Sequence, residues 1–245
     1  MNLYIDTGNS RIRLVTDDGY PDRVVAYYYT PETLAALFRE YASGIQRPAR
    51  VLIANVAGSA AAEILTDQCQ QLWSLAAEFL FSSRSICGVT NSYDDPSRLG
   101  VDRWLALIAG WNKYRDYVCV IDCGSAVTAD LVTADGAHLG GYIIPGIYMM
   151  QQALMQRTGQ ITLAGEYRFT GQPGRTTDEC VYNGTTCAIT AFIGYIMQSV
   201  NTTTSSQYRC LITGGGAEAI IPLLDIEFQH EPMLVMEGIR LVGNS

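Results

Sequence analysis

Two short acidic turns, separated by about half the chain, have the residues needed to handle a phosphorylated ligand. The first is Asp6 followed by Gly8, in MNLYIDTGNSRIRLVTDDG, and the second is Asp122 followed by Gly124, in VCVIDCGSAVTADLVTADG. Each stretch reads as an apolar strand, a D-x-G turn, a second strand and an Asp-Gly turn. Turn N–H groups approach phosphates closely, and carboxylates organise the cations that neutralise them. Together the turns predict a nucleotide triphosphate site, although either aspartate alone could be an ordinary turn former.

A third acidic site lies in NSYDDPSRLGVDRW, residues 91–104. Here Asp102 stands at or just before the start of a helix, in which Trp104, Leu107, Ile108 and Trp111 recur on one apolar face. A carboxylate at a helix start could accept the proton of a substrate hydroxyl, and the adjacent Arg103 could pair with a carboxylate or phosphate. The alternative is that Asp102 is an N-cap.

Other kinds of site are disfavoured. The chain has no GxxxxGK[ST] loop, which argues against a P-loop fold, although its glycine run Thr213–Ala217 lies between a predicted strand and a helix. Its two histidines, His138 and His230, have no cysteine or carboxylate at ligand spacing, so zinc is disfavoured. The same shortage of histidine weakens any Ser-His-Asp or Cys-His scheme.

The composition indicates a globular protein of the cytoplasm. The 245 residues are 48% hydrophobic and 16% charged, with a net charge of −8. That balance disfavours nucleic acid or an anionic membrane as the main partner, but it permits a phosphorylated small molecule. The seven cysteines form no CxxC pair, which favours free thiols in a reducing compartment. The N-terminus has no signal-like core, and no apolar run approaches a membrane span.

The order of predicted elements supports two similar α/β halves, each beginning with an acidic hairpin. Two facing hairpins would create a cleft, which is where small ligands usually bind. The helices expected from periodicity and end signals are 31–43, 59–79, 147–157, 177–200 and a final pair, with strands at ARVLIANVAG, LGGYIIPG and CLITGGG.

Several motifs in order resemble type III pantothenate kinase. They are D-x-G-N-S at Asp6–Ser10, G-V-D-R-W at Gly100–Trp104, D-x-G-x-A-x-T at Asp122–Thr128, H-L-G-G-Y-I-x-P-G at His138–Gly146, and Thr177 in GRTTDECVYNGT, continued by LITGGG and MLVMEGI. The resemblance implies an α/β fold of two ribonuclease-H-like domains, residues 1–115 and 116–245. Such a fold belongs to the acetate-kinase, hexokinase and actin-like ATPase superfamily, with duplicated halves around a nucleotide cleft.

The resemblance also implies a reaction and its cofactors. The reaction is ATP-dependent phosphorylation of pantothenate to 4′-phosphopantothenate, the first step of coenzyme A synthesis. The implied cofactors are ATP, magnesium and a monovalent cation, potassium or ammonium. Phosphoryl transfer depends mainly on positioning and charge neutralisation, which suits a site of carboxylates and turn amides without histidine.

Site residues carry over to the matching positions. Asp102 is the implied proton acceptor, Asp6 lies near magnesium, and Asp122 binds the monovalent cation. The first phosphate loop comprises Asp6, Thr7, Gly8, Asn9, Ser10, Arg11, Ile12 and Arg13, and Ser125, where the family usually has threonine, contacts ATP. The implied pantothenate contacts are Tyr93, Gly100, Val101, Asp102, Arg103 and Thr177.

Some of these positions have structural alternatives. Thr176-x-x-Glu179 is a capping-box pattern, so this threonine pair could serve mainly to start the helix. Tyr93 could be structural, and His138 reads as a strand-edge residue. The apolar helix Cys187–Met197 could form the interface of a homodimer, which the resemblance favours, or it could be core.

Two other functions remain open from the residues alone. One is a nucleotide-binding regulatory or actin-like relative of the superfamily that binds ATP without a small substrate; it would not need Asp102, Arg103 and Thr177. The other is a sugar or acetate kinase, which the short length and the GVDRW motif disfavour.

Overall fold

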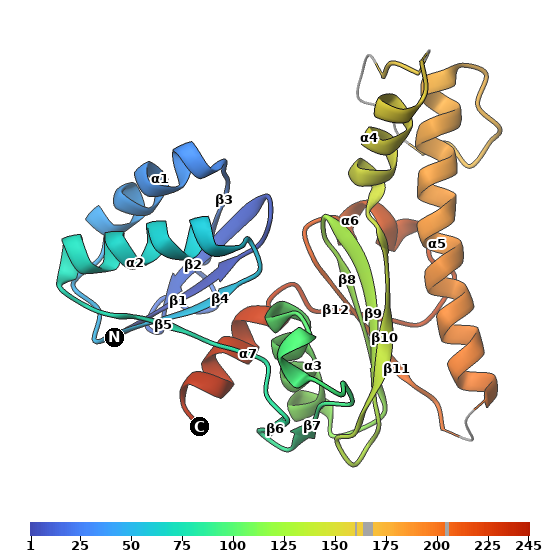
Figure 1. The fold of residues 1–245 in the computed structure, drawn as a ribbon. Helices are drawn as coiled ribbons and strands as arrows, with labels where there is room; N and C mark the ends of the chain where they lie inside the picture. Colours follow the sequence, from blue (N-terminus) through green and yellow to red (C-terminus); the bar gives the residue numbers. More distant parts are fainter. Residues whose placement is uncertain (160, 164–168, 204–205) are drawn as a thin grey trace. The chain divides into compact units, whose positions relative to one another are not determined.

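The computed structural model describes residues 1–159, 161–163, 169–203 and 206–245, and these form two compact units (Figure 1). The first unit comprises Met1–Lys113, Gly136–His138 and Met233–Ser245, and the second comprises Tyr114–Asp135 and Leu139–Pro232. Each unit is built on a mixed five-stranded sheet. Two units, each with a five-stranded sheet and packed helices, confirm the predicted α/β fold class.

The sheet of the first unit has the strand order β3-β2-β1-β4-β5. Its strands are β1 (Asn2–Thr7), β2 (Arg11–Thr16), β3 (Val25–Tyr28), β4 (Arg50–Asn55) and β5 (Ala77–Phe79). The central strand β1 runs antiparallel to β2 and parallel to β4. Alternate residues such as Leu3, Ile5 and Ile53 form a core with the apolar sides of α1 (Pro31–Ser43) and α2 (Ser59–Trp73).

The sheet of the second unit repeats this order as β10-β9-β8-β11-β12. Its strands are β8 (Val118–Cys123), β9 (Ala126–Val132), β10 (His138–Pro145), β11 (Arg209–Thr213) and β12 (Gln229–His230). Here β8 takes the place of β1, antiparallel to β9 and parallel to β11. One face packs against α5 (Thr177–Thr203) and α6 (Ala217–Ile220), and α4 (Ile147–Arg157) lies beside α5 (Figure 1).

Two further helices complete the first unit. The helix α3 (Val101–Tyr114) is buried on nearly all sides, from Arg103 through Trp111, rather than on the single apolar face that its periodicity predicted. The last helix, α7 (Leu234–Gly243), packs against β1 and β4. The short elements are β6 (Ser85–Ile86), β7 (Val89–Thr90) and the 3₁₀ turns η1 (Pro96–Arg98) and η2 (Ile221–Leu223).

The predicted domains, 1–115 and 116–245, remain predictions, and the compact units differ from them at Gly136–His138 and at the C-terminal end. The first change of unit along the chain falls after Lys113, close to the predicted boundary. However, the segment Met233–Ser245 groups with the first unit because α7 covers β1 and β4. The repeat of the hairpin in the sequence does not predict that the C-terminal helix packs on the first unit.

Two predicted helices differ from the observed ones. The helix predicted over 59–79 ends at Trp73, because Ser74 adopts a left-handed conformation (φ 52°) and its N–H caps the carbonyls of Cys69 and Gln70. The residues that follow, Ala77–Phe79, form the edge strand β5. In the final pair, α6 is only one turn long and continues as η2.

The expectation that no apolar run approaches a membrane span is wrong for α5. Its segment Thr177–Thr202 is long and apolar enough to cross a bilayer by length and composition. However, this test is also passed by core helices of soluble proteins, and 44% of the apolar window is buried. Ile189, Ile193 and Ile196 of this helix belong to the core of the second unit.

Candidate active site

Asp6 is a buried carboxylate near the end of β1. It lies on the sheet face opposite the α1 and α2 core, because its neighbour Ile5 faces that core. The antiparallel register places Arg13 opposite Asp6, with Arg13 Nε 3.7 Å from Asp6 Oδ2. Burial raises the pKa of Asp6 to about 6; the Asp102 carboxylate adds to this rise, whereas Arg13 and Arg11 oppose it.

The turn after Asp6 is held by backbone hydrogen bonds. The Gly8 N–H donates to the Arg11 carbonyl at 2.9 Å, and the Tyr29 hydroxyl donates to the Gly8 carbonyl at 2.6 Å. Asn9 and Ser10 at the tip are exposed. The rest of the predicted phosphate loop divides by burial: Arg11 and Arg13 are half-buried, Thr7 is buried, and Ile12 packs in the α1 and α2 core. Ile12 can therefore contribute only its backbone.

Asp102 lies in the first turn of α3, as the sequence predicted. Its Oδ1 accepts the backbone N–H of Arg103 at 2.8 Å. The chain is tight here, since a Cβ on Gly100 would lie 2.7 Å from Asp102 Oδ1. The helix dipole stabilises a negative charge at this position. Because the Asp102 charge acts on Asp6, the structure brings these two predicted acids into one region of the first unit.

Arg103, Tyr93 and His138 form a connected polar group in the first unit. Arg103 is buried, and its Nη1 donates to the Tyr93 hydroxyl at 3.2 Å. The Tyr93 ring stacks on His138 with centroids 6.0 Å apart, and His138 Nδ1 lies 3.2 Å from Ser92 Oγ. His138 begins the edge strand β10, as expected, but it is also buried and supports Tyr93. The sequence reasoning missed this supporting role.

The loop that carries Tyr93 is fixed by side-chain hydrogen bonds. Arg84 donates from Nη1 to the carbonyls of Asn91 and Tyr93 and from Nη2 to that of Asp94, at 2.8–3.0 Å. The buried Asn91 side chain accepts the Tyr93 N–H at 3.0 Å. Sequence reasoning missed Arg84 and Asn91; the available signal was an Asn two residues before Tyr93, which is an Asx-turn pattern.

In the second unit, Asp122 has hydroxyl neighbours on both adjacent strands. Its register partners are Thr128 on β9 and Thr213 on β11. The preceding residues on β8 and β11, Ile121 and Ile212, face the α5 core. Asp122, Thr128 and Thr213 therefore lie on the opposite face of the sheet.

Glycines allow backbone to pack closely around the second D-x-G turn. Gly214 has φ +93°, and a Cβ there would collide with Asp122 Oδ1 and the Cys123 backbone. A Cβ on Gly146 would lie 2.6 Å from the carbonyl oxygens of Gly124 and Ser125, and the Gly146 N–H donates to Ser125 at 2.9 Å. These contacts explain why the GGYIIPG and TGGG motifs accompany the D-x-G motif. Ser125 itself is exposed.

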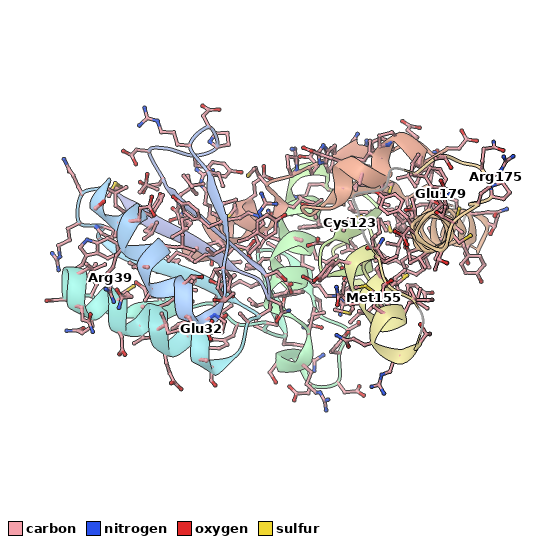
Figure 2. All side chains as sticks on the ribbon, turned by 90° about the horizontal axis from the view of Figure 1, so that it is seen from above. Glu32, Arg39, Cys123, Met155, Arg175 and Glu179 are labelled. Carbon is pink, nitrogen blue, oxygen red and sulfur yellow. The ribbon has the colours of Figure 1, made fainter. Side chains whose placement is uncertain are left out.

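Thr177 is the first residue of α5 and is exposed. The capping role belongs to its neighbour, because Thr176 Oγ1 accepts the Glu179 N–H at 3.2 Å. The Glu179 carboxylate in turn accepts the Arg175 N–H at 2.7 Å, one residue before the expected partner; Figure 2 labels both residues. The predicted cap therefore resides in Thr176 and Glu179.

The predicted site residues divide between the two units. Asp6–Arg13, Tyr93 and Gly100–Arg103 belong to the first unit, and Asp122, Ser125 and Thr177 belong to the second. Within the described ranges, no group of three His, Cys, Asp or Glu residues could hold a metal by itself. The cleft that would unite the two sets remains a prediction.

Comparisons with known proteins identify the family. The family model for type III pantothenate kinase matches residues 2–199. A type III pantothenate kinase of Nitrosococcus oceani is 36% identical, over 99% of this chain and 94% of its own length. One from Alcanivorax borkumensis is 33% identical, over 99% of this chain and 98% of its own.

Two solved structures share the fold of this chain. A candidate Baf family transcriptional activator from Campylobacter jejuni aligns with a TM-score of 0.58 and 19% identity, over 99% of this chain and 97% of its own. The ethanolamine utilization protein EutJ from Carboxydothermus hydrogenoformans aligns with a TM-score of 0.53 and 12% identity, over 98% and 89%. Because the family model matches most of the chain and full-length relatives are above 30% identical, the chain belongs to the type III pantothenate kinase family.

Proposed function

We propose that this chain transfers the γ-phosphoryl group of ATP to pantothenate, giving 4′-phosphopantothenate in the first step of coenzyme A synthesis. Family membership supports the substrate and the reaction. The single observation that carries the chemistry is Asp102 in the first turn of α3, close enough to Asp6 to raise its pKa. An acid held at a helix start beside a second acid suits proton transfer next to a cation-bound phosphate.

Asp102 accepts the proton of the attacking pantothenate hydroxyl. Its position at the helix start favours the ionised form, which is the form that a general base needs. One oxygen, Oδ1, is occupied by the Arg103 N–H, and this bond fixes the plane of the carboxylate. Phosphoryl transfer requires little else of the protein beyond alignment and charge neutralisation.

The residues around Asp6 fit magnesium and ATP. The buried Asp6 carboxylate has a pKa near 6, and a nearby divalent cation would favour its charged form. Bound magnesium supplies charge neutralisation to the phosphates, and Asp6 would hold it. Arg11, Arg13 and the N–H groups of the turn Thr7–Ser10 orient the phosphates, and Ser125 contributes a hydroxyl from the second unit.

Asp122 fits the monovalent cation. Its sheet neighbours are two neutral hydroxyl residues, Thr128 and Thr213, and no basic residue occupies the register positions beside it. The close packing of Gly214 against the carboxylate fixes its position. A carboxylate held in this way offers oxygen ligands and a charge that a cation can balance.

The residues expected to contact pantothenate belong to both units. Tyr93 is held by Arg84 and Asn91, and its hydroxyl accepts a hydrogen bond from Arg103. The buried Arg103 guanidinium would bind the pantothenate carboxylate, since its Nη1 is already oriented by Tyr93. Thr177 contributes an exposed hydroxyl because Thr176 performs the capping.

The chain acts as a cytoplasmic homodimer that uses the exposed side of α5. Within Cys187–Met197, Ile189, Ile193 and Ile196 are core, whereas Ala191 and Tyr195 are exposed. One side of this helix thus packs in the core of the second unit, and the other side is available for a homodimer interface. Tyr195 is 67% exposed. On the adjoining strand β10, Tyr142 contacts Phe192 of α5 and is half exposed, which extends the apolar surface. All seven cysteines are free thiols, in keeping with a reducing compartment.

A coupled assay tests the reaction. ADP release is followed with ATP and magnesium, with pantothenate present or omitted, in potassium or lithium chloride. We expect ADP release to require pantothenate and to be faster in potassium. ADP release that ignores pantothenate would instead support the ATP-binding relative without a small substrate.

Light scattering tests the homodimer. Tyr195→Arg places a charge on the exposed side of α5 and should shift the mass to that of a monomer. Gln71→Arg, at an exposed position of α2 in the first unit, is the control and should leave the mass unchanged. A wild-type chain that is monomeric at micromolar concentration would refute the dimer.

A further inference from the structure

Thr213 has a buried hydroxyl that the fold does not use. It is the last residue of β11 and is fully buried, and its Oγ1 has no hydrogen-bond partner among the described residues. Buried hydroxyl groups are normally paired, so an unpaired one indicates a missing partner. Because threonine and valine have nearly the same shape, packing alone gives no reason for a hydroxyl here.

The sheet register places this hydroxyl beside Asp122. Thr213 is the direct partner of Asp122 in the parallel pair β8–β11. The preceding residues of the two strands, Ile121 and Ile212, both face the α5 core, so Asp122 and Thr213 share the other face. The next residue, Gly214, packs directly against Asp122 Oδ1, which fixes the carboxylate next to the end of β11.

The register partners of Asp6 in the first unit differ from those of Asp122. Asp6 has Arg13 and Ala54 as its register partners, whereas Asp122 has Thr128 and Thr213. The first carboxylate thus has a cation from the chain and a methyl group beside it. The second has two hydroxyl oxygens beside it, and hydroxyl and carboxylate oxygens are ligands suited to a hard cation.

We propose that Thr213 Oγ1 is a ligand of the monovalent cation bound by Asp122. This inference rests on the proposed cation role of Asp122 and assigns Thr213 a part in it. The hydroxyl oxygen donates a lone pair to the cation, and no covalent bond changes. The cation is then the polar partner that Thr213 Oγ1 lacks among the described residues.

Thermal unfolding in the absence of nucleotide provides a test that does not depend on turnover. Potassium that binds the folded chain raises its melting temperature with concentration, and the curve gives an apparent dissociation constant. In lithium chloride, Thr213→Val should melt at or above the wild-type temperature, because valine removes an unpaired buried hydroxyl. In potassium chloride, Thr213→Val should lose most of the stabilisation, with the apparent dissociation constant raised about tenfold or more.

Two further variants sharpen the result. Thr213→Ser retains the hydroxyl and should keep the potassium constant within about threefold of the wild type. Thr186→Val is the matched control: Thr186 is a buried threonine of the same unit whose hydroxyl bonds the Tyr182 carbonyl, and its loss should leave the potassium response unchanged.

The outcomes separate this inference from the function on which it rests. If Asp122→Asn abolishes the potassium response while Thr213→Val keeps the wild-type curve, the role of Thr213 is refuted and the cation site stands. If the wild-type melting temperature does not respond to potassium or ammonium, the cation role of Asp122 and the role of Thr213 are both overturned.

Discussion

The two acidic hairpins share a backbone frame but differ in how their carboxylates are balanced. In both sheets an aspartate near the end of the central strand is flanked by an antiparallel and a parallel neighbour. Asp6 faces Arg13 at 3.7 Å, whereas Asp122 has threonines on both sides. The same fold thus holds one acid with a charge partner from the chain and one whose register neighbours are neutral.

This difference is the basis on which we propose distinct tasks for the two halves of the fold. Arg13 and Arg11 lower the cost of the buried Asp6 charge, although burial still dominates its pKa. At the second hairpin no register neighbour supplies positive charge. We therefore expect substitutions in the first unit to affect proton and phosphate chemistry, and those at Asp122 to affect dependence on the monovalent cation.

The largest expected effect follows from removing Asp102, the proposed proton acceptor. Asp102→Asn should lower kcat for pantothenate phosphorylation by about 10²–10⁴-fold, the usual contribution of a general base. Binding of ATP, measured by calorimetry, should persist because Asn is nearly isosteric. The residual activity should keep the wild-type dependence on potassium. A rate within a few-fold of the wild type would refute the role of Asp102.

A smaller effect concerns the pH dependence of stability caused by Asp6. Its pKa is raised from 3.8 to about 6, so the folded state binds more protons than the unfolded chain between these values. Protonated Asp6 therefore stabilises the folded state at low pH, and this stabilisation is lost as the pH rises through about 6. Asp6→Asn cannot ionise. Without magnesium and ATP, it should be more stable than the wild type above pH 7 by up to about 3 kcal/mol, from a shift of about two units.

Urea unfolding between pH 5 and 8 measures this difference, which should shrink toward the acid end. The exposed Asp18→Asn, in the same unit, is the control and should show no such trend. Parallel stability curves for Asp6→Asn and the wild type would mean that the folded chain does not raise the pKa of Asp6.

The next effect distinguishes the two hairpins directly. Asp122→Asn should raise the potassium concentration for half-maximal activity about tenfold or more, since a carboxylate ligand is lost. Asp6→Asn should lower activity without moving that midpoint. Potassium titrations of both variants in the coupled assay check this. If the two variants shift the midpoint equally, the division of tasks between the hairpins is wrong.

The smallest effects separate the two threonines at the start of α5. Thr176→Ala should reduce the free energy of unfolding by about 1 kcal/mol through loss of the cap, with little change in KM for pantothenate. Thr177→Ala should leave the free energy of unfolding unchanged and raise the KM for pantothenate. Urea unfolding and steady-state kinetics on the same samples decide the matter. A lowered stability in Thr177→Ala with an unchanged KM would assign it a structural role only.

Local patterns in the sequence sufficed for the hairpins and most helices. Apolar runs that lead into D-x-G turns predicted both central strands, and Pro31 and Gly44 marked the ends of α1. The acid at the start of α3 was predicted at the correct helical position. In each case the signal lies within a few neighbouring residues, which is where sequence reasoning is strongest.

What could not be predicted depends on contacts between distant segments. The stacking of Tyr93 on His138 joins residues 45 positions apart, and the pairing of Asp122 with Thr213 joins residues 91 apart. The end of α2 was missed because Ser74, which carries no strong stop signal, adopts a left-handed conformation. Periodicity reports which face is apolar, but it does not report which strands become neighbours.

The packing of α7 on β1 and β4 has a consequence for biosynthesis. On the ribosome, the strands of the first unit emerge early, yet the helix that covers one face of them is made only after the second unit has been translated. The second unit, whose two segments lie between Tyr114 and Pro232, is complete in the nascent chain before that helix appears. The core of the first sheet with α1 and α2 can therefore form early, whereas the part of this sheet that contacts α7 is covered only after the whole second unit has been made.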